Sequence, residues 1–82
     1  MKLFIIGKAA DAPKPVAAKW GYDCTYAMLV RAKDEQAARL VAHDNSSGDQ
    51  GADVWLDSAA TDCQEVTAKG QPAVLMTDFL AG

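Results

Sequence analysis

The chain has 82 residues, and its 41 hydrophobic residues include 16 alanines, which leaves 25 larger apolar side chains for a core. A chain of this length forms a single domain, here residues 1–82, and none of its apolar runs approaches the roughly 20 residues of a membrane-spanning helix. Two cysteines are too few for a secreted disulfide scaffold, and the net charge of −3 disfavours binding to nucleic acid.

The amino-terminal part predicts one strand followed by a long connection. Residues 2–6 are apolar on both faces, which indicates a central or covered strand that Gly7 ends. Residues 8–21 contain Pro13 and Pro15 among small residues, so we expect an irregular or extended connection and no helix there. The short apolar run before Gly7 does not resemble a signal peptide, and we expect a cytoplasmic protein.

An alternating pattern over residues 23–32 predicts a second strand. The even-numbered residues are expected to face the core, and these are Cys24, Tyr26, Met28, Val30 and Ala32. Asp34 then has the position and side chain of a helix N-cap, with Glu35 near the positive end of the helix dipole. In the helix, the expected buried stripe is Ala37, Leu40 and Val41, and the residues expected outward or on the flank are Gln36, Arg39 and His43.

The carboxyl-terminal half predicts two more strands. Residues 44–53 are rich in Gly, Ser and Asp and must form turns, and residues 54–56 return to apolar. Residues 61–68 read as a third strand, and a short turn at 69–72 joins it in a hairpin to a last strand at 73–80. The predicted fold is an α+β, two-layer domain of order β-β-α-β-β, in which one helix covers one face of a four-stranded mixed or antiparallel sheet.

Cys24 and Cys63 each lie near the start of a predicted strand. They would be neighbours if those strands were parallel, so a disulfide or a metal pair stays open beside two buried thiols. Buried thiols are the favoured interpretation, because cysteine commonly behaves as a small apolar residue.

Acidic residues are concentrated in the second half of the chain. Residues 1–43 carry seven Lys and Arg against four Asp and Glu, whereas residues 44–82 carry one Lys against seven acids. Five of these acids, Asp44, Asp49, Asp53, Asp57 and Asp62, fall in or near the turn-rich connection. They would attract a basic partner, or they serve only as turn and cap residues that keep the chain soluble.

No motif in the chain predicts catalysis, a cofactor or a metal site. His43 has Asp44, Ser46 and Ser47 as close neighbours along the chain, which cannot converge as a hydrolytic triad does. A calcium loop starting at Asp44 would need glycine at position 49 and glutamate at position 55, and both are absent. Cys24, His43 and Cys63 lack the paired spacing of a zinc site.

The two tryptophans, Trp20 and Trp55, lie in connections between predicted elements. In so small a domain aromatic residues usually belong to the core, but a tryptophan beside acids is also a common interface anchor. The second interpretation gives the set of candidate partner-binding residues: Trp20, Asp44, Asp49, Asp53, Trp55, Asp57 and Asp62.

Several segments taken in order carry a resemblance. They are Tyr22 to Cys24, Ala27 to Ala32 followed by Asp34 to Arg39, Val54 to Asp57, and Ala73 to Gly82, whose ending Asp-Phe-Leu-Ala-Gly is the most distinctive. Residues 22–82 thereby resemble a group of small uncharacterised phage and prophage proteins, which implies a phage or mobile-element origin and transfers no site residue. Residues 8–21 lie outside the resemblance.

These observations predict a non-enzymatic, protein-binding module. A phage origin would suit an inhibitor of a host defence complex, such as a CRISPR effector, whose basic nucleic-acid-binding surface complements an acidic one. The expected partner is therefore a host or phage protein with a basic surface, and neither nucleic acid nor membrane is expected to bind directly. Two alternatives are a small homo-oligomeric structural or virion accessory protein joined through a strand edge, and a module that binds a small ligand or metal.

Overall fold

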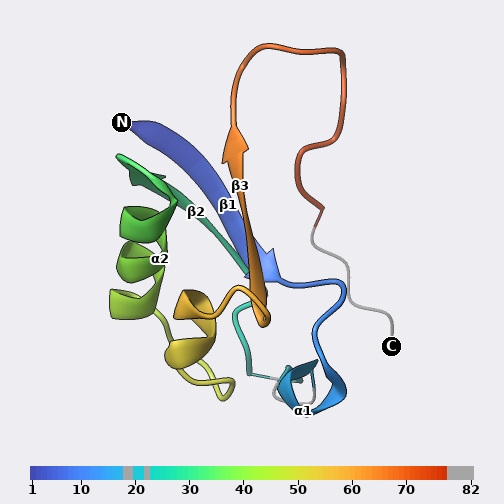
Figure 1. The fold of residues 1–82 in the computed structure, drawn as a ribbon. Helices are drawn as coiled ribbons and strands as arrows, with labels where there is room; N and C mark the ends of the chain where they lie inside the picture. The colour runs from blue at the N-terminus through green and yellow to red at the C-terminus, as the bar shows by residue number, and fades with distance from the viewer. Residues whose placement is uncertain (18–19, 22, 78–82) are drawn as a thin grey trace.

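The computed structural model describes residues 1–17, 20–21 and 23–77. Its elements are β1 (Lys2–Lys8), α1 (Lys14–Ala17), β2 (Ala27–Ala32), α2 (Glu35–Asp44), the 3-10 helix η1 (Asp53–Leu56) and β3 (Thr61–Val66). Figure 1 shows α2 and η1 on one side of the sheet and the segment after β3 on the other. The α+β class and the antiparallel sheet with one long helix on one face are confirmed.

The sheet has three strands in the order β2-β1-β3, and β1 is antiparallel to both neighbours. β2 and β3 therefore run parallel on either side of β1, and α2 connects them across one face. The central position expected for the first strand is confirmed. In the register, Ile6 lies opposite Met28 and Cys63, whereas Ile5 lies opposite Leu29 and Gln64. Directly paired residues share a face, so even-numbered residues of β1 face α2 and odd-numbered residues face the other side.

The prediction of a fourth strand is wrong over the described residues. Residues 73–77 have no regular secondary structure, and residues 78–80 lie outside the described part of the chain. The connection after β3 includes Gly70 and Pro72. Gly70 has a φ of 136°, which glycine adopts more readily than other residues, and Pro72 has no backbone N–H to donate to a strand. This connection carries the chain to the side of the sheet opposite α2, so no hairpin forms with the described residues of β3.

The segment before the second strand and the start of that strand also differ from the prediction. α1 occupies part of the segment expected to be irregular, and Pro15 is accommodated because the first-turn amides of a helix have no partner within that helix. β2 begins at Ala27 rather than near Asp23, because Asp23 has a positive φ of 59° that interrupts the extended chain. Cys24 instead forms an isolated antiparallel bridge with Gly48.

The core lies between the sheet, α2 and η1. Its buried apolar side chains are Phe4, Ile6, Trp20, Val30, Ala32, Ala38, Ala42, Val54, Trp55 and Ala60, with Cys24, Met28, Ala37 and Cys63 packed against them. The core face predicted for the second strand is confirmed at Val30 and Ala32, while Tyr26 is exposed.

The buried face predicted for the helix is wrong at Leu40 and Val41, whereas Ala37 packs partly buried against the core as predicted. The start of the helix is confirmed, because the Asp34 side chain accepts a hydrogen bond from the Ala37 amide at 2.8 Å. The residues it buries, however, are Ala38, Arg39 and Ala42, whereas Leu40 and Val41 remain 48% and 40% exposed. Two alanines one turn apart present a flat surface that lets α2 approach the sheet closely, which large side chains at those positions would prevent. Among the described residues, no helix has the length and hydropathy needed to cross a membrane.

Candidate functional site

The two tryptophans belong to the core. Trp55 is fully buried and Trp20 is 8% exposed, and their rings meet edge to face with centroids 5.9 Å apart. The Trp20 ring also packs against Tyr26 at a centroid distance of 5.7 Å. The interpretation of Trp20 and Trp55 as interface anchors is therefore wrong in this conformation, because their side chains are needed to fill the interior.

The predicted aspartates, in contrast, are all exposed, and two of them meet at one imidazole. His43, in the last turn of α2, places Nδ1 3.0 Å from Oδ1 of Asp44 and Nε2 3.6 Å from Oδ1 of Asp53. α2 and η1 thereby bring together two carboxylates that are nine residues apart in the sequence. A neutral imidazole donates from one nitrogen only, so the tautomer of His43 decides which of the two carboxylates accepts an N–H hydrogen bond.

Asp57 and Asp62 have different surroundings. Oδ1 of Asp57 accepts a hydrogen bond from the Ala59 amide at 2.8 Å, so this carboxylate shapes the turn after η1, as expected of a turn aspartate. Asp62 is opposite Gly7 in the β1–β3 register and so lies on the side of the sheet away from α2. We therefore define the acidic surface as Asp44, Asp49, Asp53 and Asp57, and leave Asp62 outside it.

The loop that carries Asp49 is held in place by the segment before β2. The Asp49 amide donates to the Asp23 carbonyl at 3.0 Å, and Nε2 of Gln50 donates to the Thr25 carbonyl at 2.9 Å. Oγ1 of Thr25 in turn donates to the Ser47 carbonyl at 3.0 Å. Gln50 is only 4% exposed, so its amide group is an internal brace of the loop. These bonds fix the backbone around Asp49, one of the four residues of the acidic surface.

Gly48 makes this close approach possible. Its φ is 122°, and a Cβ at this position would lie 3.0 Å from the Asp23 carbonyl oxygen and still closer to Oε1 of Gln50. Any other residue would force both the loop and the brace to move.

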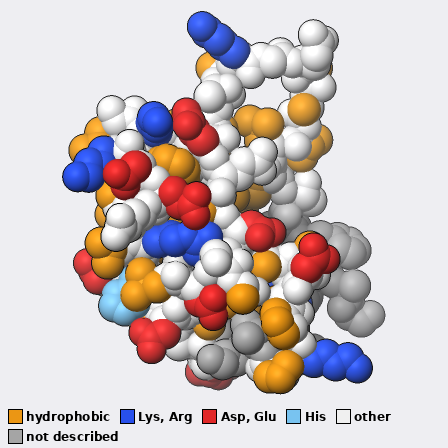
Figure 2. Space-filling model, viewed as in Figure 1, with side chains coloured by type: hydrophobic (Ala, Val, Ile, Leu, Met, Phe, Trp, Pro, Cys, Tyr) orange, Lys and Arg blue, Asp and Glu red, His pale blue; other side chains and the backbone are white. Residues whose placement is uncertain are grey.

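In the part of the chain that the structure describes, no Lys or Arg forms a salt bridge with the acidic surface. Within the described ranges, the ion pairs made by Lys and Arg are Lys2 with Glu65 at 3.9 Å and Arg39 with Glu35 at 3.0 Å, and neither involves the acidic surface. Figure 2 shows acidic side chains spread over the face formed by α2, η1 and β3, with isolated Lys and Arg side chains between them. The negative charge of this side is therefore available to a partner.

Arg39 joins the three elements beneath this face, and the prediction that it lies outward or on the flank of the helix is wrong, because it is only 8% exposed. Its guanidinium donates to Oγ1 and the carbonyl oxygen of Thr61 at 2.8 and 3.0 Å, and to the Trp55 carbonyl at 3.2 Å. Nε also donates to Glu35 one turn back on α2, at 3.0 Å. Oγ1 of Thr61 in turn donates a hydrogen bond to the Val54 carbonyl of η1 at 2.9 Å. α2, η1 and β3 are therefore locked to one another through a single buried side chain.

The sequence offered only an ambiguous signal for Arg39. Glu35 and Arg39 are four residues apart on a helix, a spacing that is typical of exposed ion pairs. The arginine is buried because η1 and β3 present two main-chain carbonyls to it, and no sequence pattern reports where those carbonyls point.

Both cysteines are thiols, and the two form no disulfide. Burial raises the pKa of the Cys63 thiol above its ordinary value of 9.0, and the charge of Glu35 raises it further while Arg39 opposes the shift. Cys63 is therefore protonated at neutral pH and packs partly against the core.

The His43 region does not have the arrangement of a hydrolytic site. The Ser46 hydroxyl donates to the His43 main-chain carbonyl at 2.9 Å, so the hydroxyl caps the end of α2 rather than bonding to the imidazole. Across the described residues, no three His, Cys, Asp or Glu side chains converge in an arrangement that could hold a metal ion.

Comparisons with protein-family models, with curated proteins and with solved structures give no match for this chain. The resemblance of residues 22–82 to phage proteins therefore stays a prediction from sequence.

Proposed function

We propose that this protein is a non-enzymatic binding module that presents Asp44, Asp49, Asp53 and Asp57 to a basic surface on a partner protein. The observation that carries the proposal is that the acidic surface is fixed in advance and not neutralised. Its loop is bonded to residues 23–25, and within the described chain its carboxylates contact His43 but no Lys or Arg.

Fixing an acidic surface before binding has two physical consequences. A uniform sign of charge steers an oppositely charged partner toward the surface and speeds association. A loop that is already ordered loses less conformational entropy on binding, so more of the contact energy appears as affinity. Binding of this kind weakens as salt screens the charges, with a Debye length of about 8 Å at physiological ionic strength.

The class of partner follows from the charge together with the phage resemblance. A basic groove built for nucleic acid on a host defence complex would accept this surface in place of the phosphate backbone. The protein would then act in the cytoplasm of the host, on a protein partner, without touching nucleic acid or membrane itself.

The test compares two sets of variants in pull-downs from host lysate at low and high salt. The triple variant Asp44→Asn, Asp49→Asn, Asp53→Asn removes three charges from the acidic surface without shortening a side chain. Asp62→Asn is the control, since it removes a carboxylate on the other side of the sheet. The proposal expects a partner that is captured by the wild type and by the control at low salt, and lost with the triple variant. Capture that is indifferent to the triple variant and to salt would contradict it.

A second candidate, a homo-oligomeric accessory protein, has an observation of its own. Over the described residues, β2 and β3 each leave one edge without a strand partner. Open strand edges pair readily with other chains. Light scattering that shows a defined assembly at micromolar concentration would favour this candidate, and a monomer would count against it.

A further inference from the structure

The side of the sheet that faces away from α2 carries several apolar side chains, beside the polar Arg31, Asp62 and Gln64, and no described helix covers it. By the strand register this outer face carries Leu3 and Ile5 from β1, Leu29 from β2 and Val66 from β3. Leu29 is 62% exposed and Leu3 is 38% exposed. In a domain with so few large apolar side chains, leaving several of them on one open face calls for a covering element.

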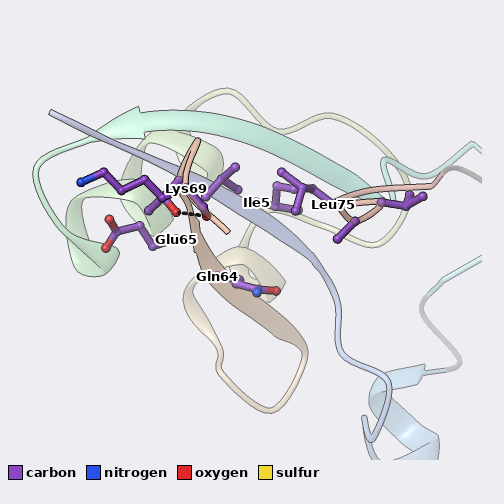
Figure 3. Close-up of a pocket in the computed structure, with 9 residues that line it drawn as sticks. Ile5, Gln64, Glu65, Lys69 and Leu75 are labelled. Atoms are coloured by element: carbon purple, nitrogen blue, oxygen red, sulfur yellow. Dashed lines mark hydrogen bonds between the residues drawn. The ribbon is translucent and has the colours of Figure 1, made fainter. Parts of the chain in front are cut away.

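The chain itself supplies a segment on this side. After β3 it turns back, and residues 73–75 form one wall of a pocket of about 390 Å³ whose other wall includes Ile5 and Val66. Figure 3 shows the Ile5 and Leu75 side chains next to each other at this pocket, with Lys69 and Glu65 at its opposite end. The pocket therefore lies between the sheet and an apolar stretch of the same chain, and its lining also includes Gln64, Glu65, Thr67 and Lys69.

The segment is apolar and yet poorly buried. Val74, Leu75 and Met76 are 81%, 62% and 50% exposed, respectively. No backbone hydrogen bond joins the described residues 73–77 to the sheet. Both walls of the pocket thus expose apolar side chains, and bringing them together would remove both from water.

We propose that the outer face of the sheet is a hydrophobic docking surface and that its occupant is residues 73–77 of the same chain. Val74 and Leu75 descend into the pocket and cover Ile5 and Val66. The docked segment shields the outer face from other chains. It leaves the acidic surface untouched, because that surface is built from α2, η1 and their connecting loop.

The tether favours this occupant over a second copy of the chain. The connection from β3 to the segment is only residues 67–72, and the segment already lines the pocket. A short tether holds its end at an effective concentration on the order of millimolar, so a second copy at micromolar concentration competes poorly for the same face.

Methyl NMR spectroscopy of the wild-type protein tests the proposal without any substitution. We expect nuclear Overhauser effects between the methyl groups of Leu75 and those of Ile5 and Val66. In a mixture of labelled and unlabelled protein, these effects must remain within one chain. Effects that pass between chains would overturn the proposal by making a second copy the occupant. A complete lack of effects would overturn it by showing the face uncovered.

A matched pair of leucine variants gives a second readout. Leu75→Gln weakens the docking segment, and Leu40→Gln changes a leucine of similar exposure on α2, which does not line the pocket. We expect Leu75→Gln to raise binding of an apolar fluorescent dye several-fold while Leu40→Gln leaves it near the wild-type level. Equal dye binding by the two variants would contradict the proposal.

Discussion

The two sides of the sheet are held in different ways. On the side of α2, hydrogen bonds from the buried Arg39 join α2 to η1 and β3, Asp34 caps α2, and Gln50 holds the Asp49 loop to Thr25. On the outer side, residues 73–77 have no backbone bond to the sheet among the described residues and rely on apolar side chains alone. Hydrogen bonds fix geometry, whereas apolar contact is non-directional. The side of α2 is therefore suited to present fixed charges, and the outer side to rearrange.

Among the predicted substitutions, the largest loss of stability is expected at Arg39. Arg39→Met keeps the length of the side chain but leaves the carbonyls of Trp55 and Thr61 without their donor, which should lower the free energy of unfolding by about 3 kcal/mol. Urea denaturation measures this difference. Arg31→Met is the control, since Arg31 is exposed on β2 and its loss should cost no more than about 0.5 kcal/mol. Equal losses for the two variants would mean that Arg39 is not the lock between α2, η1 and β3.

Gly48 tests whether the acidic loop depends on its brace. Gly48→Ala forces an alanine into a left-handed conformation beside Gln50 and should destabilise the protein by roughly 1–3 kcal/mol. Gly21→Ala is the matched control, because a Cβ at Gly21 would meet no atom within 4 Å. Thermal unfolding of the two variants provides the comparison. A Gly48→Ala protein as stable as the Gly21→Ala protein would show that the loop is not tightly held.

The cap of α2 should have a smaller effect. Asp34→Ala removes the acceptor of the Ala37 amide and is expected to lower the free energy of unfolding by about 1 kcal/mol. Asp34→Ser keeps an acceptor oxygen and should restore most of the loss. If the alanine and serine variants had the same free energy of unfolding, the side-chain cap of α2 would not stabilise the protein.

The smallest expected effect is the dependence of stability on pH through Cys63. The folded pKa of Cys63 is raised above its ordinary value of 9.0, so folding favours the protonated thiol. The stabilisation is fully present below about pH 9 and declines as the pH rises through the raised pKa. Alkylation of Cys63 in the folded protein should therefore be slower near pH 9 than in urea, as followed by mass spectrometry. Equal rates in both states would contradict a buried thiol at this site.

The parts of this fold that depend on local pattern could be predicted, and those that depend on packing could not. The Asp34 cap, the core face of β2 and the central place of β1 follow from spacing and side-chain type in the neighbouring residues. The helix face was misjudged because size favours Leu40 and Val41, while close approach to the sheet favours Ala38 and Ala42. The strand expected at residues 73–80 has suitable residues, but in residues 73–77 it lacks a bonded neighbour.

The candidate site shows the same division. The exposure of Asp44, Asp49, Asp53 and Asp57 could be predicted from turn chemistry, because such residues rarely lie in a core, whereas Asp62 belongs to β3. The meeting of Asp44 and Asp53 at His43 depends on how η1 packs against α2, which no local pattern reports. Trp20 lies in a connection as predicted, whereas Trp55 lies in the 3-10 helix η1, and both rings belong to the core.

Amide hydrogen exchange at Asp49 tests most directly whether the acidic surface is fixed before a partner binds. The Asp49 amide donates to the Asp23 carbonyl, so we predict protection well above that of an unstructured peptide in the wild type, and loss of that protection in Gly48→Ala. An Asp49 amide that exchanges in the wild type as fast as an unstructured peptide would contradict the account.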